Sequence, residues 1–397
     1  LALGAAAERA LLASGRLVPT VSLWAVRPRR FARDFAAELE ASPRIRVLLG
    51  AQAIGLVERG EGGRVAAVRL RTLEGCDLEA RARAFVLACG GLENARLLLL
   101  STDRRPEGLG NASGLVGRCF MDHPRAVWGR VELVPGARLH LLRGRPVPNG
   151  KVQLGLAVAP AIRADRGLLH HYLTLESEHS SYAREQYDVA VQLAKRLLRR
   201  GHAGGRLELR GVLAGRTPDL LYLLTPKEIL PHWAYRLLWE LHERLPRRSR
   251  SERLVLVHFC EQPLDPDSRV TLSERCDPLG VPMLRLDWRI QPEVVRSMEA
   301  LCTLLGEELA RTGLGRLLPA EEEPRFTDAS HHMGTTRMGT DPRTSVVDPW
   351  GRVHGVANLW IAGSSIFPSG GHANPTLTIV ALALRQARRI ASSVGAG

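Results

Sequence analysis

The stretch Ala84-Phe-Val-Leu-Ala-Cys-Gly-Gly91 decides the fold of this chain. Its first six residues form a continuous apolar run, which is typical of a strand buried on both faces of a parallel sheet. A glycine pair follows, and the residues from Glu93 to Ser101 have a helical pattern. A strand, a glycine pair and a helix in this order predict a turn at which backbone can approach a ligand closely.

The same α/β character extends to both sides of this stretch. Upstream, Arg46 to Leu49, Ala53 to Val57 and Arg64 to Leu70 predict strands of a meander, because they are short apolar or alternating runs between glycines and charges. Far downstream, Asn358 to Ala362 is another short apolar strand. Asn374-Pro375 then predicts a helix start, because asparagine is a preferred N-cap and proline suits the first helical position.

The middle of the chain, from about Met121 to Trp288, has a different texture. Five strand-like runs alternate there with helical ones, which predicts a mostly antiparallel sheet with helices on one side. The strands are expected at Val127 to Leu133, Lys151 to Val158, Leu254 to Phe259, Arg269 to Leu272 and Met283 to Trp288. Helices are expected near Glu185 to Arg200 and Trp233 to Leu245, and an amphipathic one from Pro292 to Gly313.

Charge and composition exclude several classes of protein. The chain has 397 residues, 45% of them hydrophobic, and a net charge of +14. The basic residues are dispersed apart from a cluster at Arg247, Arg248 and Arg250, and no basic and aromatic interleaving indicates nucleic-acid binding. The apolar runs are too short for a transmembrane segment. A non-catalytic basic binding protein stays a remote alternative.

Neither a disulfide framework nor a metal site is expected. The six cysteines include no CxxC pair. His170, His171, Glu178 and His179 are close in sequence, but they lack the HExxH spacing that brings two histidines to one helix face.

Two segments near the end carry groups suited to catalysis. They are His331-His-Met-Gly-Thr-Thr-Arg-Met-Gly339 and Gly371-His-Ala-Asn-Pro-Thr-Leu-Thr378. They resemble the His-x-x-Gly-Thr and Asn-Pro-x-x-Thr segments of the glucose–methanol–choline (GMC) oxidoreductase family. Three further segments resemble the family in the expected order, at residues 86–99, 114–124 and 268–272.

The resemblance implies a reaction and two catalytic residues. The family members are FAD-dependent oxidoreductases, so we expect oxidation of a CH–OH group of an alcohol, sugar or polyol by hydride transfer to the flavin. His331 matches the catalytic base, a role that suits histidine because it titrates near neutral pH. Asn374 would hold the substrate hydroxyl as a neutral donor and acceptor; alternatively, it serves only as an N-cap.

The resemblance also implies cofactor contacts. The helix start at Asn374, Pro375 and Thr376 would face the flavin and stabilise its reduced, negatively charged form. The other matching residues are Ala53, Gly90, Gly91, Ala362 and Gly363. Ala53 would place its backbone near the adenine. For Gly90 and Gly91, tight packing of helix on strand is the alternative interpretation.

Other polar residues near these motifs have less definite roles. His332 is the second candidate for the base and, with His372, is expected to line the substrate pocket. His123 is expected to support the fold. Glu261 follows a predicted strand and could either point into the pocket or cap the sheet edge.

One departure from the family concerns the dinucleotide-binding start. A strand followed by GxGxxG is absent, and Gly108 to Gly114 has the wrong spacing. We therefore expect the C-terminal two-thirds of a GMC enzyme, which by itself binds FAD poorly and is inactive.

The expected fold is α/β. An incomplete, discontinuous Rossmann-like FAD domain (1–120 and 326–397) would be interrupted by an α+β substrate domain (121–325). The electron acceptor could be a partner protein or a quinone, or oxygen if the enzyme is an oxidase; the sequence does not indicate the compartment.

Overall fold

A computed structural model describes residues 6–25, 29–59, 63–137, 139, 145–147, 150–177, 237 and 252–395. The chain divides into two compact units. Unit 1 comprises Leu1–Arg30, Arg125–Phe259 and Val295–Phe326, and unit 2 comprises Phe31–Pro124, Cys260–Val294 and Thr327–Gly397. The helices expected near Glu185 and Trp233, and the basic cluster at Arg247, lie outside the described residues.

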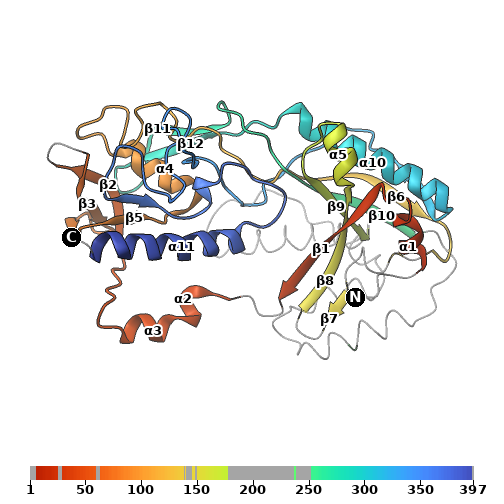
Figure 1. Cartoon of the computed structure of the whole chain (residues 1–397), viewed down its shortest axis with the longest axis horizontal. Coiled ribbons are helices and arrows are strands. Elements are labelled where there is room, and N and C mark those ends of the chain that lie inside the picture. The colour runs from red at the N-terminus through yellow and green to blue at the C-terminus, as the bar shows by residue number, and fades with distance from the viewer. Residues whose placement is uncertain are drawn as a thin grey trace. The chain divides into compact units, whose positions relative to one another are not determined.

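Unit 1 is built on one sheet with the strand order β1-β8-β9-β10-β6-β13, and β7 pairs with β8. The strands are β1 (Leu17–Ala25), β6 (Arg125–Leu133), β7 (Arg145–Val147), β8 (Gly150–Val158), β9 (His171–Ser177), β10 (Glu252–Cys260) and β13 (Gly315–Leu318). The pairs β1–β8, β8–β9, β10–β6 and β13–β6 all run antiparallel, as Figure 1 shows for β1 and β8. The antiparallel sheet predicted from the middle of the sequence is confirmed.

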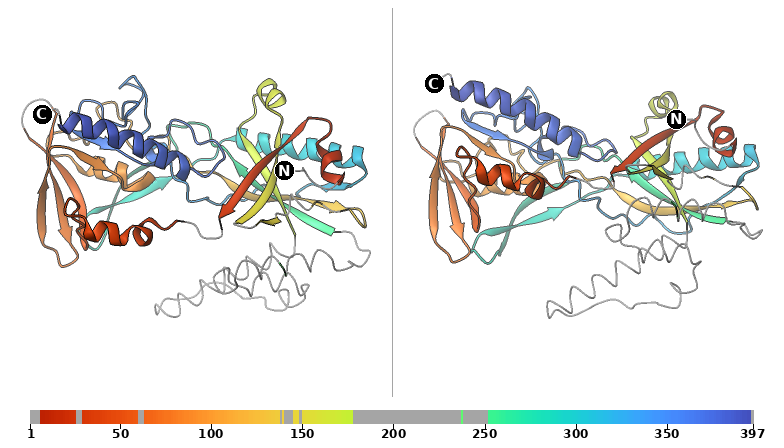
Figure 2. Two further views of the ribbon diagram at one scale, coloured as in Figure 1. Left: turned by 60° about the horizontal axis from the view of Figure 1, so that its bottom comes forward. Right: turned by 90° about the horizontal axis from the view of Figure 1, so that it is seen from below.

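The long helix α10 (Pro292–Thr312) covers this sheet (Figure 2). Its apolar face contributes Leu301, Leu304 and Leu305 to the same buried cluster as Leu156 and Leu254 of the sheet. The amphipathic pattern therefore predicted the helix and its buried face correctly. The described part of unit 1 also contains two short helices, α1 (Ala6–Leu12) and α5 (Pro160–Asp165).

The first residues of the chain pack differently from the expected domain plan. β1 pairs with β8 over nine residues, from Leu17 opposite Val158 to Ala25 opposite Gly150. The chain before Phe31 therefore belongs to unit 1, and the two-stranded sheet of β11 (Arg269–Cys276) and β12 (Pro282–Asp287) belongs to unit 2. Strand pairing over a long sequence separation determines the placement of β1.

Unit 2 contains Ala84 to Gly91, the predicted strand with its glycine pair. β5 (Phe85–Leu87) pairs in parallel with β14 (Leu359–Ile361), and α4 (Gly90–Leu100) follows β5. An antiparallel meander of β2 (Ala51–Glu58), β3 (Val65–Thr72) and β4 (Asp77–Arg81) forms a separate sheet. The remaining helices are α2 (Phe31–Asp34), α3 (Ala36–Ala41), the 3₁₀ turn η1 (Ser364–Ile366) and the long α11 (Thr376–Gly395), which is conspicuous in Figure 1.

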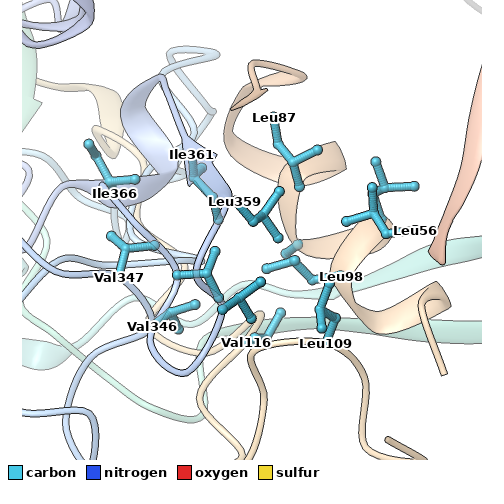
Figure 3. Close-up of a cluster of buried hydrophobic side chains, with 14 of the residues drawn as sticks. Leu56, Leu87, Leu98, Leu109, Val116, Val346, Val347, Leu359, Ile361 and Ile366 are labelled. Atoms are coloured by element: carbon cyan, nitrogen blue, oxygen red, sulfur yellow. The ribbon is translucent and has the colours of Figure 1, made fainter. Parts of the chain in front are cut away.

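One apolar cluster joins these elements of unit 2 (Figure 3). Leu56 from β2, Leu87 from β5, Leu98 from α4, and Leu359 and Ile361 from β14 are all buried in it. Segments as far apart in the sequence as Leu56 and Ile361 thus share one core, which holds the first strand–helix turn against the C-terminal motifs.

Two local predictions are wrong. Arg46 to Leu49 is not a strand: the chain there is irregular and leads to β2 at Ala51 (Figure 1), and the Leu49 side chain is 85% exposed. β5 is not buried on both faces, because Val86 is 47% exposed between the buried Phe85 and Leu87. A strand requires a partner as well as an apolar sequence, and partners are set by the tertiary fold.

The helix α11 begins at Thr376, directly after Pro375, so proline precedes the first helical residue. None of the helices in the described ranges is long and apolar enough to cross a bilayer.

Candidate active site

An isolated antiparallel bridge in unit 2 brings the two histidine-containing segments together. Met121 and Met333 exchange backbone hydrogen bonds of 3.0 and 2.8 Å, and both side chains are fully buried. Continued by one and two residues, this antiparallel register sets Asp122 opposite His332 and His123 opposite His331. The side-chain contacts follow this register.

His331 and His123 form a hydrogen-bonded imidazole pair. Their Nδ1 atoms are 3.0 Å apart, and the rings meet edge to face with centroids 5.0 Å apart. The Nε2 of the buried His123 lies 3.3 Å from the carbonyl oxygen of Gly370. From the sequence, His123 was expected only to support the fold, and no local signal indicated its contact with His331.

The buried carboxylate of Asp122 fixes the backbone around both histidines. Its Oδ1 accepts the backbone N–H groups of His123 at 2.6 Å, His331 at 3.1 Å and Ala329 at 3.3 Å. Its Oδ2 lies 3.9 Å from Nε2 of His332. Because one oxygen binds three amides from two segments, Asp122 holds these segments in register.

Burial lowers the pKa of both paired histidines. For His331 desolvation is the main cause and the neighbouring His332 adds to it, while the charge of Asp122 raises the pKa. For His123 desolvation again lowers the pKa, while its bond to Gly370 raises it. Both rings are therefore held in the neutral form near pH 7, the form in which an imidazole can accept a proton.

The His331 segment packs tightly on the start of α4. A Cβ added to Gly91 would lie 2.2 Å from the carbonyl oxygen of His332, and Ser364 donates a hydrogen bond of 2.7 Å to the same oxygen. Thr335 donates to the carbonyl oxygen of Gly91. Gly91 therefore leaves no room for a side chain between the start of α4 and the His331 segment. Gly90 has a φ of 91° and open space at its Cβ position.

Asn94 joins the start of α4 to the segment after β14. Its Nδ2 donates to the carbonyl oxygen of Ala362 at 3.2 Å and to Ser365 Oγ at 2.9 Å, and its Oδ1 accepts the backbone N–H of Cys89 at 2.8 Å. Ala362 and Gly363, two of the expected cofactor residues, therefore lie at the same end of the parallel strand pair as Gly90. This is the edge at which open α/β sheets bind ligands.

The loop before α11 is attached at two points, to His123 and to Glu261. Gly370 accepts the bond from His123, and the backbone N–H of Gly371 donates to Glu261 Oε1 at 3.3 Å. Glu261 thus binds the loop that carries His372 and leads to Asn374. Pro375 is buried, whereas the Asn374 and Thr376 side chains are exposed.

A cavity of about 330 Å³ opens beside the start of α4 in unit 2. Its lining residues come from β2, the end of β5 and α4: Gln52, Ala53, Cys89, Glu93, Arg96, Leu97 and Leu100. The volume is at the lower end of the range of small-molecule sites, about 300–1,000 Å³. Ala53, the residue expected near the adenine, is among them.

Comparison with known proteins supports the resemblance. Residues 265–383 match the family model for GMC oxidoreductases. The chain is 29% identical to paromamine 6'-oxidase of Streptomyces fradiae, over 91% of this chain and 55% of that protein. It is 31% identical to 6'''-hydroxyparomomycin C oxidase of Streptomyces lividus, over 91% of this chain and 54% of that protein.

The chain spans about half the length of these curated relatives. The crystal structure of pyridoxine 4-oxidase from Mesorbium loti matches with a TM-score of 0.54 at 16% identity, covering 97% of this chain and 69% of that one. This structural likeness shows the α/β fold. Residues 265–383 therefore carry the C-terminal segment of the GMC oxidoreductases, a family of FAD enzymes, and the rest of the chain is similar to the relatives in sequence and fold.

Proposed function

We propose that this chain carries the catalytic base of an FAD-dependent enzyme that oxidises a CH–OH group of a sugar, polyol or other alcohol. The names of several relatives support this substrate class: besides the two Streptomyces oxidases there is a fructose dehydrogenase large subunit of Gluconobacter japonicus, 29% identical over 80% of this chain. The observation that carries the proposal is the His331–His123 pair.

His331 has the properties of a general base. Its imidazole is only partly buried, it is held by a neighbouring ring, and burial keeps its pKa below the ordinary value. A neutral imidazole in this state takes the proton of an alcohol while the C–H hydride departs. Asn374, in the loop tied to His123 through Gly370, would bind the substrate oxygen from a second direction.

The cofactor would be held by residues at the edge of the parallel strand pair. The expected contacts are the start of α11 at Asn374, Pro375 and Thr376, together with Ala53, Gly90, Gly91, Ala362 and Gly363. FAD, when bound, supplies the hydride acceptor. The residues of the chain orient the alcohol and remove its proton.

Substitution of His331 tests the base in a flavin-loaded protein that contains this chain. We expect His331→Ala to lower kcat by roughly 10²–10⁴, the usual effect of losing a general base, with the flavin spectrum retained. His354→Ala is a matched control, because His354 is a half-buried histidine of unit 2 that bonds Ser345 at 2.9 Å.

His332→Ala separates the two candidate bases. If it abolishes turnover while His331→Ala leaves it intact, His332 is the base. If both variants turn over normally with FAD bound, the proposed chemistry is wrong.

The final electron acceptor has two candidates, because the relatives include oxidases and a dehydrogenase. An oxidase would release hydrogen peroxide under air without added acceptor. A dehydrogenase would need a dye, a quinone or an acceptor protein. Parallel assays with and without oxygen distinguish them.

A further inference from the structure

The hydrogen bonds of His123 determine where the proton of each ring lies. A carbonyl oxygen can only accept, so the contact between His123 Nε2 and the Gly370 oxygen requires the proton on Nε2. A neutral imidazole carries one N–H, so Nδ1 of His123 is an acceptor. Its partner at 3.0 Å is Nδ1 of His331, which must then supply the proton. The Nε2 of His331 is left with a lone pair.

We propose that His123 is a positioning residue that holds His331 in the Nδ1–H tautomer, so that Nε2 of His331 is the atom that takes the substrate proton. The inference rests on the proposed function and specifies its atoms. The substrate O–H proton passes to His331 Nε2, and the hydride from the substrate carbon passes to FAD. The alcohol becomes a carbonyl compound, and His331 becomes an imidazolium with a proton on each nitrogen.

The antiparallel register of the two segments is what pairs His123 with His331. His123 stands opposite His331 because Met121 is bridged to Met333, and Asp122 fixes the backbone of both histidines. His123 itself is 1% exposed, and the acceptor nitrogen of its ring is occupied. It is therefore unable to act as the base, although it belongs to the same site.

The hydrogen-bond chain also ends in a way that prevents proton escape through it. The Gly370 oxygen is a peptide carbonyl without a proton to exchange, so a proton accepted at His331 Nε2 leaves by the side on which it arrived. The bond from His331 Nδ1–H to His123 strengthens when His331 becomes charged, since charge-assisted hydrogen bonds are the stronger ones. His123 thereby stabilises the product state of the base.

Several charged or titratable groups face the pair. Asp122 raises the pKa of both histidines, whereas His332 lowers that of His331, and His372 lowers that of His123. Glu261 binds the adjacent loop through Gly371. These groups stay constant in the variants below, so a changed pH profile reports on the His123 ring.

The test uses two substitutions of His123 in the flavin-loaded enzyme. His123→Leu fills a similar volume without an acceptor, and we expect kcat to fall roughly 10–100-fold, as for the loss of other partners that orient a functional histidine. The acid limb of the kcat/KM profile should move to lower pH, because the imidazolium loses its acceptor. His123→Asn offers an amide oxygen near the former Nδ1 and should restore most of the rate and the profile. His354→Leu should leave both unchanged.

Nitrogen NMR of the histidine rings provides a measurement that does not depend on the folding of a His123 variant. In the unsubstituted protein near pH 7, His331 should show a protonated Nδ1 and an unprotonated Nε2, assigned by comparison with His331→Ala. An Nε2-protonated His331, or a folded His123→Leu enzyme with the original pH profile, would overturn the inference. In that case an inactive His331→Ala would still support the proposed base, whereas an active one would refute the base itself.

Discussion

Two adjacent glycines at the start of α4 are required for different physical reasons. Gly90 has a backbone conformation that L side chains rarely adopt, with φ at 91°. Gly91 has an ordinary conformation but no room for a side chain, because the backbone of His332 lies where a Cβ would be. The resemblance implied cofactor contacts for both. In the structure, Gly91 also brings α4 against the histidine segment.

We therefore predict that Gly91→Ala destabilises unit 2. Overpacking of this kind costs about 1–3 kcal/mol, and here the group displaced is backbone, which cannot rotate away. Activity should fall as well, because the His331 segment must shift. Thermal and chemical unfolding measure the loss. Gly395→Ala is the control: this helical glycine of α11 has open space, so alanine there should be neutral or slightly stabilising. Equal stability of the two variants would contradict the packing role of Gly91.

A second residue-scale prediction concerns Asn374. Its side chain is exposed and α11 begins two residues later, at Thr376. We expect Asn374→Ala to lower turnover of the flavin-loaded enzyme by roughly tenfold or more, since one hydrogen bond to the reacting oxygen is worth about 1.5–3 kcal/mol if charge develops there. The free energy of unfolding should change by less than about 1 kcal/mol, the value of a full N-cap. A loss of stability without a loss of turnover would leave Asn374 only a capping role.

At the scale of elements, one guanidinium ties α4 to the β11–β12 hairpin. Arg96 is buried; its Nη2 donates to Asp277 Oδ2 at 2.8 Å and its Nε to the carbonyl oxygen of Pro282 at 2.8 Å. The hydrogen bond from Arg96 lowers the pKa of the Asp277 carboxyl. Both elements belong to unit 2, and Arg96 also lines the cavity beside α4.

Removal of this guanidinium should be strongly destabilising. We expect Arg96→Met to lower the free energy of unfolding by about 3 kcal/mol, because a mostly buried carboxylate and a carbonyl group lose their donor. The matched control is Arg343→Met. Arg343 pairs with Asp341 at 2.8 Å, but its side chain is 85% exposed, and such pairs contribute about 0–1 kcal/mol. Denaturant unfolding measures the free energy of unfolding of both variants. A small effect of Arg96→Met would show that the hairpin is held mainly by its apolar contacts.

At the scale of the whole molecule, buried histidines make both units sensitive to acid. In unit 1, His258 is fully buried, bonds His171 at 2.9 Å and the Trp128 carbonyl oxygen at 2.8 Å, and has its pKa lowered by burial to about 4. In unit 2, burial lowers the pKa of His123 and His331. At each of these histidines, the folded protein favours the neutral imidazole over the charged one.

The folded protein is therefore expected to lose stability as the pH falls. Above the ordinary histidine pKa of 6.5, His258 is neutral in both the folded and the unfolded chain, so its full contribution to stability is present. Between pH 6.5 and about 4 the unfolded chain takes up a proton that the folded chain does not, so stability falls. The total loss is about 3 kcal/mol.

Denaturant unfolding from pH 7.5 to 4 measures this loss. His258→Gln should reduce the slope of the free energy of unfolding of unit 1 against pH. The reduction should correspond to about one proton fewer taken up on unfolding. His354→Gln, which removes a half-buried imidazole from unit 2, should not change the slope of unit 1. A wild-type slope in His258→Gln would show that His258 is not the group responsible.

Sequence alone predicted much of the secondary structure and the motifs. The strand and helix around Gly90, the helix from Pro292 and the antiparallel strands of unit 1 were identified by periodicity and apolar runs, because these reflect local backbone geometry and burial. The ordered motifs from residue 86 to residue 378 identified the family, since each motif keeps its residue types and spacing within a short stretch.

Only the tertiary structure decided which segments meet. The chain before Phe31 joins unit 1 through β1, and Arg46 to Leu49 forms no strand, because strand partners come from distant parts of the chain. The contact of His123 with His331 depends on one backbone bridge between Met121 and Met333, which no local pattern encodes. Residue chemistry is local and was legible in the sequence, whereas the proton positions of the site depend on long-range register, which exists only in the folded chain.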